Sequence, residues 1–207
     1  MEKKKFQELA VRTESIVDEI NVTIVDGTTF LSVLKSYIAI TNVLDAFKKH
    51  IFYKKKLDRE RVDRELTVAW SSIDFARDLS HGETTIPISE ANGTLDMDPR
   101  IFHALLGSIT EHGEIAQAME YALYNMGELD LVNVCEELGD SDWYKALFYE
   151  ATGIDWNDVQ EMIIKKLEIR YKDKIFSEGE ADERDLEAER ALLESSIKAS
   201  VDRYNNG

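Results

Sequence analysis

The sequence predicts an all-α protein, and three observations support this. Apolar residues recur with the spacing of one helix face through most of the 207 residues. Only two prolines occur, Pro87 and Pro99, so long helices are permitted almost everywhere. No stretch alternates apolar and polar residues for long enough to indicate a strand. We therefore expect helices over residues 4–24, 29–53, 58–80, 99–126, 131–152, 156–173 and 182–203.

Turn-forming residues separate these helices. Asp26-Gly27 separates the first two expected helices, and Gly127 and Gly153 mark two later breaks. Ser177-Glu-Gly forms the break before the last helix. The longest break begins at His81 and reads HGETTIPISEANGT, rich in turn formers and without helical periodicity. These breaks predict a first helical domain over 1–80, a linker over 81–98 and a second helical domain over 99–207.

Composition excludes several classes of function. The net charge of −16 argues against binding to the phosphate backbone of nucleic acids. We expect no membrane-spanning segment and no signal peptide, because the N-terminal residues are amphipathic and no apolar run approaches the required length. Cys135 is the single cysteine, which rules out an intrachain disulfide and fits a reducing compartment. A cytoplasmic location is the expectation.

The chain also resembles itself when Phe30 is aligned with Phe102, an arrangement called the repeat alignment below. Other matching pairs are Leu34 with Leu106, Leu57-Asp58 with Leu129-Asp130, and Glu65-Leu66 with Glu137-Leu138. The register is maintained over two predicted helices, which favours an internal duplication. We therefore expect two related helical units that pack as an intrachain pseudo-dimer.

Four acids in the second unit form two pairs with the same spacing: Glu111 with Glu114, and Glu137 with Asp140. Residues three apart share a helix face, so each pair directs two carboxylates to one place. Two such helices side by side would surround one site with four acids, an arrangement that hard divalent cations make favourable. This pattern predicts a Mg²⁺ site, in which Mn²⁺ can substitute. The alternative is a solvated acidic helix face.

The first unit has lost most of these acids. In the repeat alignment, Ala39 stands opposite Glu111, Asn42 opposite Glu114 and Val68 opposite Asp140, whereas Glu65 matches Glu137. The acids are therefore not demanded by the predicted helix pair, and we expect one metal site per chain.

The second unit resembles the MazG-like, all-α nucleoside triphosphate pyrophosphohydrolases, in particular phage-encoded members. The resemblance rests on E-H-G-E at 111–114, E-E-L-G-D-S-D-W-Y at 136–144, K-K-L-E-I-R-Y at 165–171 and the tail at 177–194. L-D-A-F-K-K-H-I-F-Y at 44–53 extends it to the first unit. Thr110 departs from the family where a second acid often stands, and Met162 and Ile163 occupy the region of a common Asn.

The resemblance implies Mg²⁺-dependent hydrolysis of a nucleoside triphosphate to the monophosphate and pyrophosphate. Glu111, Glu114, Glu137 and Asp140 would be the metal ligands and catalytic carboxylates, one glutamate alternatively accepting a proton from water. The family also implies association of chains, here a homodimer.

Other candidate residues keep two interpretations. Lys166 and Arg170 share a helix face and either bind the phosphates or pair with nearby acids. Trp143 follows Asp140 by three residues and either stacks on a base or packs in the core. The basic cluster, Lys48, Lys49 and Lys54–Lys56, either contacts a nucleotide or is a solvated turn. A protein that binds a nucleotide or partner without catalysis is the alternative function.

Overall fold

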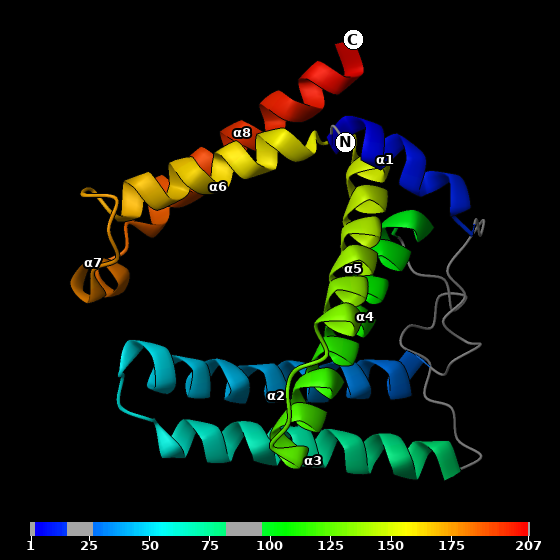
Figure 1. The fold of residues 1–207 in the computed structure, drawn as a ribbon, viewed down its shortest axis with the longest axis vertical. Helices are drawn as coiled ribbons and strands as arrows, with labels where there is room; N and C mark the ends of the chain where they lie inside the picture. Colours follow the sequence, from blue (N-terminus) through cyan, green and yellow to red (C-terminus); the bar gives the residue numbers. More distant parts are fainter. Residues whose placement is uncertain (1–2, 16–26, 82–96, 207) are drawn as a thin grey trace. The chain divides into compact units, whose positions relative to one another are not determined.

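The chain is all-α in the residues that the computed structural model describes, which are 3–15, 27–81 and 97–206 (Figure 1). This confirms the predicted fold class. The helices are α1 Lys3–Ala10, the 3-10 helix η1 Val11–Thr13, α2 Gly27–Tyr53, α3 Arg59–His81, α4 Pro99–Asn125, α5 Leu131–Thr152, α6 Trp156–Arg170, α7 Glu178–Asp182 and α8 Leu186–Asn206. Their bounds follow the predicted helices from residue 27 to residue 170 within about three residues.

Aspartates begin several of these helices. Asp58, Asp98, Asp130 and Asp155 each accept a hydrogen bond from a backbone N–H in the first turn of α3, α4, α5 and α6 respectively. The caps satisfy N–H groups that have no partner within the helix. They explain why the helix starts were readable from the sequence, since each aspartate stands immediately before its helix.

The chain divides into two compact units with different boundaries from those expected. One unit combines Met1–Asp18 with Met97–Gly207, and the other is Glu19–Asp96. The N-terminal segment belongs with the second half because α1 packs on α5 and contacts α6. The expected linker 81–98 lies mostly outside the described residues.

The first predicted helix, 4–24, is wrong over residues 11–15. The α-helix ends at Ala10, η1 follows, and Glu14 is extended with ψ of 134°. The Glu14 carboxylate pairs with Arg100 at 2.7 Å, and the Trp143 indole N–H donates to the Ala10 carbonyl at 2.7 Å. These long-range contacts stop the helix where local periodicity would continue it. The rest of that prediction, residues 16–24, lies outside the described residues.

In the unit Glu19–Asp96, α2 and α3 form an antiparallel hairpin (Figure 1). Small buried residues, Ala39, Ala69 and Ala76, let the two helices approach closely. The Ser36 hydroxyl crosses the interface and donates to the Ala69 carbonyl at 3.1 Å.

Helix α2 corrects one expectation. Its segment Thr29–Tyr53 is long and apolar enough to cross a membrane by length and composition alone, with a mean hydropathy of 1.3. The core helix of a soluble protein, which is mostly buried, and a signal sequence near the N-terminus pass the same test, and here only 22% of the apolar window is buried. The prediction that no stretch reaches this length was therefore wrong, whereas the absence of a membrane function stays a prediction.

In the larger unit, α4 packs along α5, and α6 packs along α8. Phe6, Tyr149 and Trp156 join α1, α5 and α6 through edge-on and tilted ring contacts at 6.0 and 5.4 Å between centroids. Between α4 and α5, Gly107 leaves room for the Tyr144 ring, because an added Cβ would lie 2.0 Å from Tyr144 Cε1. This contact sets the separation of the two helices one turn from Glu111.

The helix bounds support the internal repeat. The repeat alignment carries α2, 27–53, onto 99–125, the bounds of α4, and carries the start of α3, Arg59, onto Leu131 at the start of α5. The residue that follows the first helix of each hairpin is left-handed in both: Lys54 with φ of 53° and Met126 with φ of 47°. The two hairpins thus agree in the length of the first helix and in the conformation of the residue that follows it, and their origin by duplication stays a prediction.

Candidate metal centre between α4 and α5

Three of the four predicted acids converge between α4 and α5. Glu111, Glu137 and Asp140 each offer a carboxylate oxygen, and these oxygens lie within 4.8 Å of one another. Glu111 and Glu137 are buried, and Asp140 is exposed. Opposite ligands of a Mg²⁺ ion lie about 4.2 Å apart when each oxygen is 2.0–2.1 Å from the metal. The spacing of the three oxygens therefore fits such an ion after a small adjustment.

Glu114 lies at the edge of this group. Its side chain is exposed and outside the set of three oxygens, yet its charge acts on Glu137. Removal of Glu137 from water, the nearby Glu114 charge and a hydrogen bond with Glu111 together raise the pKa of Glu137 to about 6. The acids thus repel one another in the absence of a cation, which is the electrostatic setting that a divalent ion relieves.

Tyr144 is a residue of this site that the sequence reasoning missed. Burial, followed by the charges of Glu111 and Asp140, raises the pKa of the Tyr144 phenol, which keeps it protonated as a hydrogen-bond donor. Tyr144 follows Asp140 by four residues and so shares its face of α5. This four-residue spacing is the feature of the sequence from which Tyr144 could have been predicted as a residue of the site.

A pocket of about 320 Å³ adjoins the acids, lined by Thr13, Glu111, Asp140, Trp143 and Tyr144. Its volume is at the lower end of the range for small-molecule sites. Thr13 reaches the pocket from η1, and no local pattern in the sequence places it there.

Trp143 packs inside the protein and also faces the pocket. Its indole N–H is used inside the protein by the Ala10 carbonyl at 2.7 Å and the Thr13 hydroxyl at 3.2 Å. Its ring meets Tyr144 edge-on, with 5.0 Å between centroids, and also lines the pocket. It therefore fixes the N-terminal segment against α5, and base stacking by its ring stays a prediction.

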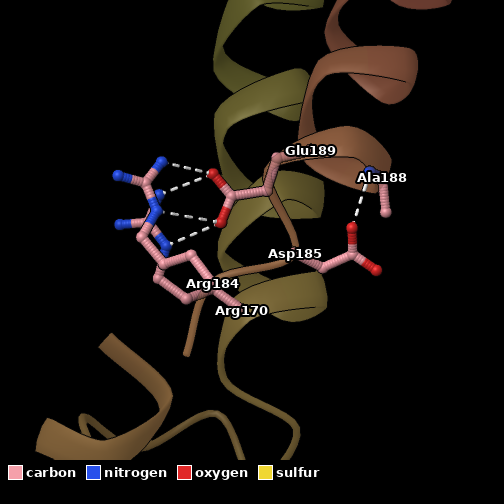
Figure 2. Close-up of polar contacts among 5 residues, drawn as sticks. All are labelled: Arg170, Arg184, Asp185, Ala188 and Glu189. Atoms are coloured by element: carbon pink, nitrogen blue, oxygen red, sulfur yellow. Dashed lines mark hydrogen bonds and ion pairs between the residues drawn. The ribbon is translucent and has the colours of Figure 1, made fainter. Parts of the chain in front are cut away.

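Arg170 binds a carboxylate of α8 and none of the converging acids. Its guanidinium makes two hydrogen bonds to the Glu189 carboxylate, at 2.9 and 2.8 Å, and Arg184 binds the same carboxylate (Figure 2). Arg170 is the last residue of α6, whereas Trp156 begins the helix at the end that meets α1 and α5. Arg170 therefore lies about 21 Å along α6 from Trp156.

Lys166, one turn before Arg170, is half-buried. Within residues 3–15, 27–81 and 97–206, no ion pair joins it to Glu111, Glu137 or Asp140. The phosphate contacts of Lys166 and Arg170 therefore stay predictions, without support from the acid cluster.

The positions of the α2–α3 hairpin that the repeat alignment pairs with the acids carry other contacts. Ala39, at the position of Glu111, is 1% exposed and fills the interface with a methyl group. Asn42, at the position of Glu114, donates through its side-chain amide to Glu65 at 3.2 Å. Glu65 corresponds to Glu137, so a hydrogen bond stands where the other hairpin has a repulsion between carboxylates.

Ser141 adds a further difference between the hairpins. Its hydroxyl, four residues after Glu137 and next to Asp140, is fully buried and has no hydrogen-bond partner in the part of the chain that the structure describes. The corresponding residue in α3 is Ala69, which is buried and has no hydroxyl. Close packing of a hairpin at this position therefore does not need a polar side chain.

A larger pocket, of about 440 Å³, lies at the junction of α1, α5, α6 and α8. Its polar groups largely pair with one another: Gln7 donates to Glu150 at 3.1 Å, and Arg203 pairs with Asp158. It holds none of the converging acids. We therefore place the candidate functional site at the smaller pocket.

Comparisons with protein-family models, with curated proteins and with solved structures gave no match to this chain. The functional interpretation therefore depends on the residues of the site and on the resemblance of their motifs.

Proposed function

We propose that the protein hydrolyses a nucleoside or deoxynucleoside triphosphate to the monophosphate and pyrophosphate, with Mg²⁺ bound between α4 and α5. The observation that carries this proposal is the convergence of Glu111, Glu137 and Asp140 from two helices onto one place. The α2–α3 hairpin strengthens it, because the same backbone is built there with Ala39, Asn42 and Val68 in place of acids. The MazG-like resemblance supplies the reaction.

The reaction requires a water oxygen to attack the α-phosphorus while the bond to the bridging oxygen of the β-phosphate breaks and pyrophosphate leaves. A bound Mg²⁺ supplies a water of lowered pKa and neutralises charge on the phosphates. Glu111, Glu137 and Asp140 would hold the ion. Glu114, exposed beside them, is left to serve as a further ligand or to accept a proton from water. The protonated Tyr144 can donate a hydrogen bond to a phosphate oxygen in the pocket.

The direct test is an incubation with Mg²⁺ and a panel of ribonucleoside and deoxynucleoside triphosphates. We expect equimolar monophosphate and pyrophosphate from at least one nucleotide, and no release without a divalent ion. Release of orthophosphate alone, or no product from any nucleotide, would contradict the proposal and leave the non-catalytic binding function.

Substitutions locate the chemistry. Asp140→Asn should lower kcat by about 100-fold or more, because the loss of a carboxylate ligand weakens the ion that stabilises the transition state. The matched control is Glu65→Gln, which removes an acid at the repeat position of Glu137 but in the hairpin without the cluster. Unchanged helicity by circular dichroism is required of both. Equal loss in the two variants would contradict the assignment.

Metal binding can be read without turnover. Titration of Mn²⁺, followed by its electron paramagnetic resonance signal, should show one site per chain that Mg²⁺ displaces. Glu114→Gln then separates its two roles. A ligand role predicts weaker Mn²⁺ binding, whereas a role as proton acceptor predicts a low kcat with Mn²⁺ binding retained.

We also propose that the two hairpins derive from one duplicated unit and pack as a pseudo-dimer, and that the chain forms a homodimer. The coincidence of helix bounds in the repeat alignment supports the duplication. Exposed apolar side chains at the α4–α5 tip, among them Tyr124 and Val132, support association.

A further inference from the structure

The acid-bearing hairpin lacks the cations that a triphosphate requires. No lysine or arginine occurs between Arg100 and Lys145, a span that holds all four acids. Arg100 pairs with Glu14 at 2.7 Å, and Lys145 pairs with Asp142 at 3.0 Å. A Mg²⁺ ion covers only part of the charge of a triphosphate, so additional cations are normally needed.

The α2–α3 hairpin shows the reverse pattern. Residues 47–61 contain seven lysines and arginines and two acids, in a chain whose net charge is −16. Lys48 and Lys49 share one carboxylate, that of Asp45, at 2.8 and 2.6 Å. Lys54 and Lys56 are exposed. In the repeat alignment the second hairpin has Glu120, Tyr121, Met126 and Glu128 opposite Lys48, Lys49, Lys54 and Lys56.

The backbone of this turn does not explain the lysines. Lys54 has a φ of 53°, in the left-handed region where glycine is the least strained residue. Met126 holds the same position and conformation in the other hairpin, so the turn forms without a cation. Two hydrogen bonds fix the turn, from Lys55 N–H to the Lys49 carbonyl and between His50 Nδ1 and the Lys55 carbonyl. A hollow of about 450 Å³, lined by residues 56–60, opens beside it.

We propose that this basic turn, Lys48, Lys49, Lys54, Lys55 and Lys56, binds the polyphosphate chain of a nucleoside triphosphate. The acids thus occur on one hairpin and the cations on the other. The identity of the ligand as a nucleotide rests on the proposed function. The affinity for polyphosphate does not.

The test uses the full chain and inorganic tripolyphosphate, titrated by calorimetry in EDTA. The variant Lys54→Met/Lys56→Glu installs the residues of the second hairpin, and we expect its Kd to rise about tenfold or more through loss of attraction. The control Lys35→Met/Lys198→Glu changes the net charge equally at exposed positions of α2 and α8 that are not part of the basic turn. Its Kd should change less than twofold. An equal loss in both variants, or no binding to the wild type, would overturn the proposal.

A second variant separates binding from folding. Lys54→Gly should raise the melting temperature, because glycine relieves the left-handed strain, while it weakens tripolyphosphate binding. Weaker binding in a more stable protein cannot come from misfolding. If Lys54→Gly binds tripolyphosphate as tightly as the wild type, the assignment of Lys54 is overturned.

Binding of a single-stranded oligonucleotide tests whether the basic turn recognises nucleic acid instead of a small polyphosphate. Tighter binding of the oligonucleotide than of tripolyphosphate through the same lysines would overturn the small-ligand assignment. A protein that hydrolyses no nucleotide but loses tripolyphosphate binding in the turn variant would end the proposed function and retain this inference. If the protein is an active enzyme and the turn variant keeps the wild-type KM and the wild-type affinity for tripolyphosphate, the proposed function stands and this inference is overturned.

Discussion

Glu137 is the residue on which the energetics of the candidate metal centre concentrate. Its carboxyl is buried against Glu111 and faces the charge of Glu114, which raises its pKa from 4.5 to about 6. The folded protein therefore holds this proton more tightly than the unfolded chain does. Without metal, stability falls as the pH rises from about 4.5 to 6, and the full loss is present above that window.

We predict that Glu137→Gln raises the melting temperature of the metal-free protein at pH 7.5, because glutamine resembles the protonated acid. The gain should disappear below about pH 4.5, where the wild-type carboxyl is itself protonated. Thermal unfolding in EDTA across pH 4–8 measures this. Glu65→Gln, beside the neutral Asn42 amide, is the control and should give no such gain. A lower melting temperature for Glu137→Gln at pH 7.5 would contradict the repulsion between these acids.

Gly107 determines how closely α4 and α5 approach. An added Cβ would collide with the Tyr144 ring, so Gly107→Ala should destabilise the protein by about 1–3 kcal/mol through overpacking. It should also weaken Mn²⁺ binding, because it moves α4 relative to Glu137 and Asp140. Gly113→Ala is the matched control on the same helix, where an added Cβ meets nothing within 4 Å. It should stabilise by about 0.5–1 kcal/mol through helix propensity. Urea unfolding of both variants checks the opposite signs.

Glu189 joins α6 to α8 through its bonds to Arg170 and Arg184 (Figure 2). Arg170→Ala should destabilise the protein by about 3 kcal/mol, because it leaves a buried carboxylate with one partner fewer. The exposed pair of Lys165 with Glu161 is the control, and Lys165→Ala should cost less than about 0.5 kcal/mol. Equal, small effects in urea unfolding would show that the pair does not hold the two helices together.

The same pair gives a pH dependence of the opposite kind. Its arginines lower the pKa of Glu189 to about 2, below the ordinary value of 4.5. The stabilisation is present in full above pH 4.5 and is lost as the pH falls toward 2. Acid unfolding of the α6–α8 pair therefore accompanies protonation of this one carboxylate.

The extent to which the sequence predicts these elements varies along the chain. Helices α2 to α5 were predictable because apolar periodicity, turn residues and aspartate caps all agree. Glu111, Glu137 and Asp140 were predictable because helical spacing alone brings them onto facing surfaces. The end of α1 at Ala10 was not, since the bond from Trp143 joins residues 133 positions apart. The Arg170–Glu189 pair likewise depends on the packing of α6 on α8.

At the scale of the whole molecule, apolar exposure predicts self-association. Tyr124 is 87% and Val132 79% exposed at the α4–α5 tip, where water contact is costly. We expect a mass of twice the chain by light scattering after size-exclusion chromatography. Tyr124→Lys/Val132→Lys should shift the protein toward the monomer, whereas Lys198→Glu, on the exposed surface of α8, should not. A monomeric wild type at micromolar concentration would contradict the predicted homodimer.

The amide of Asn42 has a consequence for how the protein responds to a shortage of magnesium. Asn42 stands at the repeat position of Glu114, and its amide donates a hydrogen bond to Glu65 where the other hairpin has two carboxylates. Under the proposed function only the α4–α5 hairpin binds an ion, so we predict that ion depletion loosens that hairpin and spares the other. Hydrogen exchange would show faster exchange in residues 107–141 on addition of EDTA, with residues 32–76 unaffected. Equal acceleration in both hairpins would contradict this asymmetry, in which only one of the two hairpins depends on the supply of the ion for its stability.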